Sequence, residues 1–378
     1  MSTCHRSSTW SVAIFPLVAI AASFLGAAND ARLYAQQPTG DLSPLSPPSP
    51  APQSNSLITR IAFGSCQTQD EPLPILETVV QWNPQLFVYL GDNIYGDTND
   101  MKVLEAKYAK MNAKPEFQKL RANVPTIATW DDHDYGANDA GKEYPFRKES
   151  KEIFLKFWNE QPQTLRRQRE GIYTDYWFKD EKLSKALHVI VLDSRTFRDP
   201  PMKNPLPSWK NDYLPDTDPT KSILGETQWK WLEEKLKEPA DVRLICSSIQ
   251  FSHEYNGFES WTNFPRELTK MVDLIKSTRA SGVIFISGDV HWGELSALRA
   301  PGCYPLYDLT ASGLNRDWES IEPNRNRIGN ACPDFHFGMI EINWNAVPSP
   351  TITFRIHDMT GRGRVRKTVK LSDLQFAK

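Results

Sequence analysis

The chain has 378 residues, a length that fits one large α/β domain or two smaller domains. Its 44 basic and 46 acidic residues nearly cancel, and neither sign forms a long block, so the composition indicates neither a nucleic-acid arm nor a membrane-binding patch. We therefore expect no specific nucleic-acid binding and no stable membrane partner.

The N-terminal residues predict a signal peptide. Arg6 precedes an apolar run over residues 10–26 that contains no charge. Pro16 interrupts this run, which is shorter than the ~20 residues that a membrane-spanning helix needs. The small residues at 26–28 or the Leu-Tyr-Ala triplet at 33–35 offer cleavage points, so we predict a signal peptide at residues 1–35 and export to the periplasm or the outside of the cell. An uncleaved anchor is the alternative.

Residues 36–56 predict an extended linker, because Pro, Ser and Gln dominate them and such a segment cannot bury enough apolar surface to fold. From residue 57 to residue 378 the composition is that of one globular domain, with no internal repeat and no second linker. We therefore expect a single folded domain at residues 57–378, and a monomer.

Three cysteines of this domain have expected structural roles. Cys246 lies in an apolar run typical of a core strand. Cys303 and Cys332 bracket a loop that contains Gly, Asn and Pro, and in an oxidising compartment we predict that a disulfide closes this loop. Two free thiols are the alternative.

Apolar runs of strand length alternate with helical patterns through most of the domain. The runs are mostly continuous, as in strands buried on both faces, and lie at residues 57–63, 86–90, 126–130, 188–192, 242–247 and 283–287. The helical patterns lie at residues 73–82, 101–111, 146–158, 226–237 and 267–277. Beyond residue 295 strands predominate, at residues 295–299, 305–311, 338–344, 352–357 and 365–371. We predict an α/β fold of two packed mixed β-sheets flanked by helices.

Polar residues directly follow four of these strands. Residues 64–66 read Gly-Ser-Cys, 91–95 read Gly-Asp-Asn-Ile-Tyr, 131–134 read Asp-Asp-His-Asp and 288–291 read Gly-Asp-Val-His. Each segment alone is typical of a turn with a capping aspartate. Because loops at the carboxyl ends of parallel strands line one crevice, the four together predict a shared metal site.

The motifs GSC, GDNIY, WDDHD and GDVHWGE, in this order over residues 61–294, resemble those of the PhoD-like phosphatases within the calcineurin-like metallophosphoesterases. The purple acid phosphatases use a related series, and the PhoD-like members differ by a cysteine at the first position. The resemblance implies a metallophosphoesterase-type sandwich of two sheets between helices. It also implies an exported alkaline phosphatase or phosphodiesterase whose substrates are small phosphate esters or phosphodiester polymers.

The resemblance implies that Cys66, Asp92, Tyr95 and His291 hold one metal ion, with Asp92 bridging to a neighbour. A thiolate, a carboxylate, a phenolate and an imidazole form an anionic, strongly donating set that suits Fe³⁺. Ca²⁺ prefers oxygen ligands and would not select sulfur.

A second metal ion is implied at Asp92, Asp132 and Asp289. Asp131 and Gln250 are further candidate ligands, although Gln250 lies in a segment that departs from the family pattern. An oxygen-dominated set favours Ca²⁺, with Mg²⁺ or Mn²⁺ as alternatives. The family precedent is iron with calcium.

Three residues are candidates for catalysis and substrate binding. His133 follows the ligand Asp132 and is the candidate general acid, and Asp134 is expected to hold its tautomer. Arg266 follows a loop that should border the crevice, so it is a candidate phosphate contact, with solvation of a helix start as the alternative.

Other polar residues have structural explanations. His188 is expected in the core, and His253 is not assigned as a ligand. Residues 193–195, Asp-Ser-Arg, resemble a recurring family segment, but a capped turn with a salt bridge explains them about as well.

We expect a metal-activated hydroxide to attack the phosphate in line, without a covalent enzyme intermediate. The sequence contains neither a Gly-x-Ser-x-Gly elbow nor a Walker-type loop. The alternative is a secreted non-catalytic protein that binds metal or phosphate through a decayed site, but such a protein would need no acid such as His133. Pocket shape, which the sequence does not show, decides between monoesters and diesters.

Overall fold

The structure, a computed structural model, describes residues 56–206 and 212–377. The predicted signal peptide, and all of the predicted linker except its last residue, lie outside the described residues. Within the described part of the chain, no helix combines the length and the apolar character needed to cross a bilayer.

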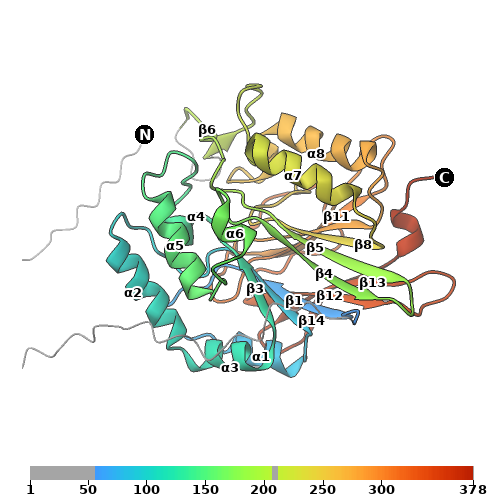
Figure 1. The fold of residues 1–378 in the computed structure, drawn as a ribbon, viewed down its shortest axis with the longest axis horizontal. Helices are drawn as coiled ribbons and strands as arrows, with labels where there is room; N and C mark the ends of the chain where they lie inside the picture. Colours follow the sequence, from blue (N-terminus) through green and yellow to red (C-terminus); the bar gives the residue numbers. More distant parts are fainter. Residues whose placement is uncertain (1–55, 207–211, 378) are drawn as a thin grey trace, which may run out of the picture. The chain divides into compact units, whose positions relative to one another are not determined.

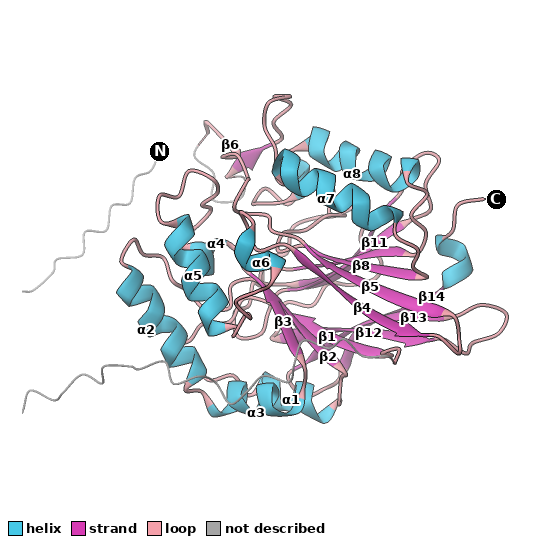
Figure 2. Cartoon of the chain, viewed as in Figure 1, coloured by secondary structure: helices cyan, strands magenta, loops and turns pink. Residues whose placement is uncertain are grey.

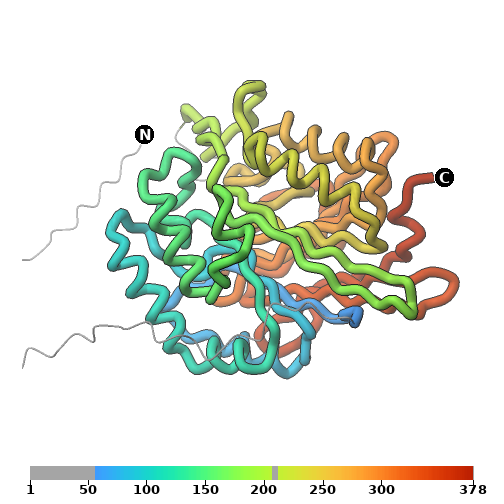
Figure 3. Tube along the Cα trace, viewed as in Figure 1, coloured from blue at the N-terminus to red at the C-terminus, as the bar shows by residue number. Residues whose placement is uncertain are grey.

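Two six-stranded mixed sheets form the centre of the domain (Figure 1). From edge to edge, the first sheet consists of β14 (Gly363–Lys370), β13 (Thr351–Asp358), β12 (His336–Asn343), β1 (Arg60–Gly64), β2 (Leu86–Leu90) and β3 (Thr126–Thr129). β1 pairs in parallel with β2 and antiparallel with β12, so the C-terminal strands lie beside the first strand (Figure 3).

The second sheet comes mainly from the middle of the chain. From edge to edge, it consists of β10 (Gly293–Leu298), β11 (Leu306–Ala311), β9 (Val283–Ser287), β8 (Val242–Cys246), β5 (Lys185–Val191) and β4 (Thr174–Asp180). A separate short ribbon pairs β6 (Met202–Lys203) with β7 (Tyr213–Leu214). The predicted α/β fold of two packed mixed sheets flanked by helices is confirmed.

Helices cover both sheets on their outer faces (Figure 2). The helices that precede β4 are α1 (Ile75–Gln81), α2 (Met101–Asn112), α3 (Pro115–Asn123), α4 (Asp132–Tyr135), α5 (Arg147–Phe157) and α6 (Leu165–Gln168). Those that follow it are α7 (Gly225–Lys237) and α8 (Pro265–Ser277), with the short 3₁₀ helices η1 (Trp261–Asn263) and η2 (Leu371–Leu374). α7 and α8 bury apolar side chains against the second sheet, whereas α1, α2, α3 and α5 pack on the first.

The apolar runs of the sequence correspond to strands with two buried faces. Along β2, Leu86 and Val88 join the core cluster that contains residues of both sheets, while Phe87 and Tyr89 join the cluster formed with the outer helices. Successive side chains of a strand point to opposite faces, so a strand between two apolar layers has no polar face. This explains why these runs are continuous rather than alternating.

The strand directions bring the loops of both sheets to one end of the sandwich. β1, β2 and β3 are parallel to one another, as are β5, β8, β9 and β11. Parallel strands end at the same edge of a sheet, which is where ligand crevices form in α/β proteins. The residues that follow these strands therefore build the candidate site.

The predicted disulfide is wrong, because Cys303 and Cys332 are free thiols. Cys332 pairs through its backbone with Gly293, the first residue of β10, whereas Cys303 follows the far end of that strand. Six residues of strand at about 3.3 Å each separate these ends by roughly 16 Å, but a disulfide needs Cα atoms within about 7 Å. Cys246 is buried in β8, which confirms its predicted place in the core.

Candidate metal centre

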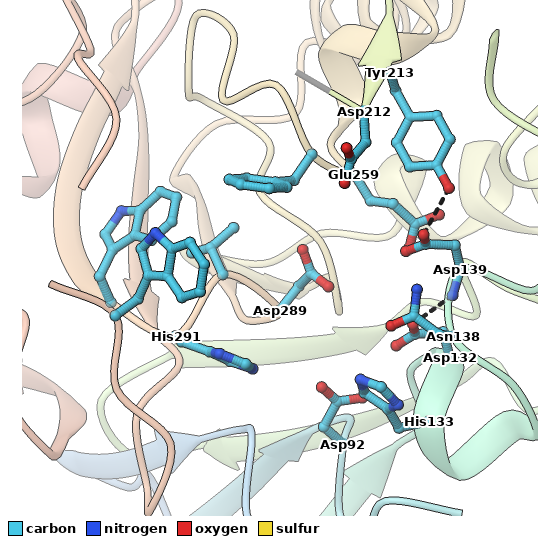
Figure 4. Close-up of a pocket in the computed structure, with 14 residues that line it drawn as sticks. Asp92, Asp132, His133, Asn138, Asp139, Asp212, Tyr213, Glu259, Asp289 and His291 are labelled. Carbon is cyan, nitrogen blue, oxygen red and sulfur yellow. Dashed lines mark hydrogen bonds between the residues drawn. The ribbon is translucent and has the colours of Figure 1, made fainter. Parts of the chain in front are cut away.

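The four predicted segments meet at one end of the two sheets. Residues of three of them, 91–95, 131–134 and 288–291, line the pocket shown in Figure 4. Among the described residues, four sets of donor atoms lie within 4.8 Å of one another. They belong to Cys66, Asp92 and His291, to Asp92, Asp132 and His133, to Asp131, Asp132 and Asp289, and to Asp132, Asp139 and Glu259. Asp92 is common to the first two sets, as a bridging ligand would be.

Four of these residues adopt the left-handed backbone conformation that side chains other than glycine rarely take. The φ angle is +58° at Cys66, +48° at Asp92, +77° at Asp289 and +64° at His291. Such a conformation costs about 1 kcal/mol or more per residue and persists where the surrounding structure imposes it. The strain thus coincides with the positions where side-chain direction matters for a metal site.

Two glycines allow the ligand loops to approach one another. Gly91 has φ +103°, and a Cβ atom there would lie 2.4 Å from the Cβ of Asp131. A Cβ atom at Gly288 would lie 2.4 Å from Oγ of Ser65. Only glycine fits at such close contacts, so both residues are needed to bring the loops together.

At one end of the cluster, the donors include sulfur. Sγ of Cys66 lies 3.4 Å from Oδ2 of Asp92 and 3.1 Å from Oγ of Ser312, and the Tyr95 hydroxyl lies 2.9 Å from Nε2 of His291. Burial, followed by the charge of Asp92, raises the pKa of the Cys66 thiol well above its usual value. A bound cation would offset that penalty and favour the thiolate.

At the other end, hydrogen bonds orient the carboxylates and leave some of their oxygens free. Oδ1 of Asp131 accepts bonds of 2.5 Å from both Nε of Arg195 and Oγ of Ser248. Oδ2 of Asp132 accepts a 2.6 Å bond from the backbone N–H of Asp139. Oδ2 of Asp131 and Oδ1 of Asp132 are buried and accept no hydrogen bond, so they remain available to a cation.

The charge balance of the cluster fits more than one metal ion. Burial raises the pKa of Asp92 and of Asp289 well above the usual range, and neighbouring carboxylates add to this effect. Oδ1 of Asp92 is also buried without a hydrogen-bond partner. Buried carboxylates either pair with cations or lose their charge, and the donor set here matches hard cations with one thiolate-binding position.

The structure places Asp97, rather than the expected Asp134, against His133. Nδ1 of His133 lies 2.8 Å from Oδ1 of Asp97, so the Asp97 carboxylate accepts the Nδ1 proton. Asp134 instead accepts bonds from the backbone N–H groups of Asp131 at 2.6 Å and Asp92 at 3.2 Å. Its carboxylate therefore holds two ligand loops together and does not set the tautomer of His133.

Two predicted site residues are not brought to the cluster. The Gln250 amide donates to Oε1 of Glu294 at 2.8 Å and accepts from Asn256 at 3.0 Å, so both of its polar ends are already engaged. Arg266 is exposed, and its Nε donates to the backbone oxygen of Thr217 at 2.8 Å. Neither side chain lines the pocket over the cluster.

The remaining histidines and the 193–195 segment have structural partners. His188 is buried with Nε2 2.9 Å from a carboxylate oxygen of Asp175, and His253 is buried with Nε2 3.6 Å from one of Glu294. Asp193 accepts from the backbone N–H of Arg195 at 3.0 Å, as a capped turn requires. Arg195 itself reaches the site through its bond to Asp131 and is more than a turn residue.

Four residues outside the predicted set complete the site: Asp97, Asp139, Glu259 and Ser312. Ser312 contacts Cys66 and accepts a 2.9 Å bond from the backbone N–H of His291. It directly follows the apolar strand β11, and the pattern that marked the other four segments would have identified it. Glu259 is buried and pairs with Arg195 at 2.5 Å, in a loop where no strand precedes it.

A pocket of about 230 Å³ opens over the cluster. Asp92, Asp132, His133, Asp289 and His291 line it, together with the aromatic residues Tyr213, Phe258, Trp292 and Trp318. A cavity of this size has room for a phosphate group with a small substituent.

Comparisons with known proteins identify a family and a fold. The family model "PhoD-like phosphatase" matches residues 61–319. The curated alkaline phosphatase D of Bacillus subtilis (strain 168) is 23% identical over 283 residues, which cover 64% of this chain and 47% of that protein, so the match spans about half of the relative. The solved structure of PhoD aligns with a TM-score of 0.62 at 18% identity, over 85% of this chain and 74% of that one. GAP50, described as the anchor in the inner membrane complex of Plasmodium, aligns with a TM-score of 0.55 at 13% identity, over 85% and 89% of the two chains.

Proposed function

The chain belongs to the PhoD-like phosphatase family, and from this membership we propose that it is an exported, metal-dependent hydrolase of phosphate esters. The observation that carries the proposal is the convergence of Cys66, Asp92, Asp132, Asp289 and His291 from separate post-strand loops, with strained backbone and free carboxylate oxygens. A structural role would not require these features together.

We assign Cys66, Asp92, Tyr95 and His291 to one metal ion, and Asp92, Asp131, Asp132 and Asp289 to a second. The first set suits Fe³⁺ and the second suits Ca²⁺, with Mg²⁺ or Mn²⁺ as alternatives for the second. Bound at these positions, such ions would supply a water molecule of lowered pKa and would neutralise charge on the substrate phosphate.

His133 is the proposed general acid. It lines the pocket, and Asp97 accepts the proton on Nδ1, so Nε2 is the ring atom left to protonate the leaving oxygen. Asp97 has the role of a positioning residue, because it sets the tautomer without contact to the substrate. Arg195, through Asp131, holds a ligand carboxylate in place.

Kinetic assays with purified, metal-loaded protein test the proposed function. We expect hydrolysis of p-nitrophenyl phosphate, of bis(p-nitrophenyl) phosphate, or of both, in proportion to the metal content of the preparation. The ratio of the two rates determines whether monoesters or diesters are preferred. A protein that retains stoichiometric metal but hydrolyses neither ester would instead be a non-catalytic metal-binding protein.

The His133→Ala variant should lose activity mainly toward substrates with poor leaving groups. A nitrophenolate leaves with little protonation, whereas an alkoxide needs a proton, so we expect roughly 100-fold loss for an alkyl phosphate and less than about tenfold for p-nitrophenyl phosphate. Metal content should stay close to that of the wild type.

The Asp97→Asn variant is the matched test of positioning. It should show the same leaving-group dependence with a smaller loss, because Nε2 remains but its tautomer is no longer fixed. Because donor atoms of His133 lie within 4.8 Å of those of Asp92 and Asp132, His133 as a ligand is the competing assignment. Equal losses for both ester types, together with lost metal, would favour it.

A further inference from the structure

Beyond the metal cluster, the described residues that line the pocket are mainly aromatic and acidic, with Asn138 and Val290 besides. Among the described residues, neither lysine nor arginine lines the pocket. Figure 4 shows Asp212 and Tyr213 on the side of the pocket away from Asp92 and His133. A substrate whose phosphate lies at the cluster would therefore direct its substituent toward these residues.

An edge-to-face pair of aromatic rings, Phe258 and Trp318, lines the same pocket. The ring centroids of Phe258 and Trp318 are 6.1 Å apart with an interplanar angle of 85°. Both residues are half-buried, and backbone contacts fix them: Trp318 Nε1 donates to the backbone oxygen of Ser320 at 3.0 Å, and Asn256 Oδ1 accepts from the Phe258 N–H at 2.9 Å. The indole N–H is thus already bonded, which leaves the π-system for a ligand.

Asp212 contributes a carboxylate to the same pocket. It is exposed and lines the pocket, and no ion pair joins it to another of the residues that the structure describes. The neighbouring Tyr213 hydroxyl donates to Oδ2 of Asp139 at 2.6 Å, so it does not neutralise Asp212. An anionic substituent would be repelled here, and a neutral one would gain nothing from the charge.

We propose that Phe258, Trp318 and Asp212 form a subsite for a small organic cation carried on the substrate phosphate, as in phosphate esters of amino or quaternary ammonium alcohols. Aromatic faces attract ammonium groups within about 6 Å, and a carboxylate beside them adds to this attraction. The proposal rests on the proposed function, since it assumes that the phosphate binds at the metal cluster.

Two inhibitors of equal shape separate the effect of the substituent's charge on binding from the effect of its size. Phosphocholine and 3,3-dimethylbutyl phosphate have the same phosphate and the same branched end, but one carries N⁺ where the other carries carbon. Both compounds are tested as competitive inhibitors of p-nitrophenyl phosphate hydrolysis. The inhibition constant of phosphocholine should be roughly tenfold lower than that of 3,3-dimethylbutyl phosphate, because a cation–π contact beside a carboxylate contributes a free energy of about this size. Equal inhibition constants would overturn the proposal.

Four variants show whether the preference comes from the named residues. Trp318→Leu and Asp212→Asn should each reduce the ratio of the two constants to about twofold, whereas Trp318→Phe, which retains a ring, should keep most of it. Glu319→Gln is the matched control, because Glu319 is exposed beside Trp318 but does not line the pocket, and its ratio should equal that of the wild type. An equal fall in Glu319→Gln would mean that general surface charge causes the preference and would contradict the subsite.

The proposed function and the subsite fail in different ways. If metal-loaded wild-type protein hydrolyses neither p-nitrophenyl phosphate nor bis(p-nitrophenyl) phosphate, the proposed function is wrong. Calorimetric titration with the same two compounds then still tests the subsite, where tighter binding of phosphocholine supports it and equal or absent binding refutes it.

Discussion

The Asp92→Asn variant should lose about a thousandfold in kcat/KM for p-nitrophenyl phosphate, which corresponds to about 4 kcal/mol of lost charge stabilisation. Asp92 shares one donor set with Cys66 and His291 and another with Asp132 and His133, so a single substitution weakens both proposed metal positions. Asparagine tolerates the φ of +48° at this position and has the same shape, so the fold should persist. Steady-state kinetics and elemental analysis of the same preparation measure the two effects.

Asp358→Asn is the matched control. Asp358 ends β13 and caps a turn through a 2.9 Å bond from the backbone N–H of Thr360, and it belongs to none of the donor sets. Its substitution should leave both metal content and kcat/KM within about twofold of the wild type, because a surface cap contributes to stability only. If the Asp92→Asn variant retained both metals and most of the activity, the proposed bridging role of Asp92 would be refuted.

How far the sequence predicts this fold depends on burial. The apolar runs at residues 86–90 and 283–287 coincide with β2 and β9, because strands buried on both faces carry no polar residues and end at glycine or serine. β4 was not predicted. It is an edge strand, mostly half-buried, and Asp175 and Lys179 flank its three consecutive aromatic residues, so the apolar run is too short to predict a strand.

The residues of the candidate site likewise divide into those that the sequence predicts and those that it does not. Cys66, Asp92 and Asp289 could be predicted because each follows a buried strand, and the strand order then determines that they meet. Asp97 and Glu259 could not, because tertiary contacts position them: Asp97 reaches His133, and Glu259 is held by Arg195. Side-chain partners chosen by sequence proximity, such as Asp134 for His133, were unreliable for the same reason.

The Cys66→Ser variant should change the visible spectrum and release most of the iron. If the Cys66 thiolate and the Tyr95 phenolate both bind Fe³⁺, charge transfer from each ligand colours the concentrated wild-type protein, and each substitution removes its own contribution. Serine replaces an anionic donor by a neutral hydroxyl, and its small size suits the buried position, whose Sγ lies 3.1 Å from Oγ of Ser312. We expect the affinity for iron to fall roughly 100-fold. Iron content and activity should decrease together as a result.

Two further variants decide whether the sulfur acts as a ligand or as a packing group. Cys66→Asp restores a negative charge with a harder oxygen donor, so it should retain more iron and more activity than Cys66→Ser while it loses the thiolate band. Cys246→Ala removes a thiol buried in β8, away from every donor set, so it should lower stability and leave the spectrum and iron content unchanged. A colourless, fully active wild type without transition metal would refute the iron assignment. A Cys66→Ser protein with unchanged metal content and rate would show that Cys66 is a packing residue and not a ligand.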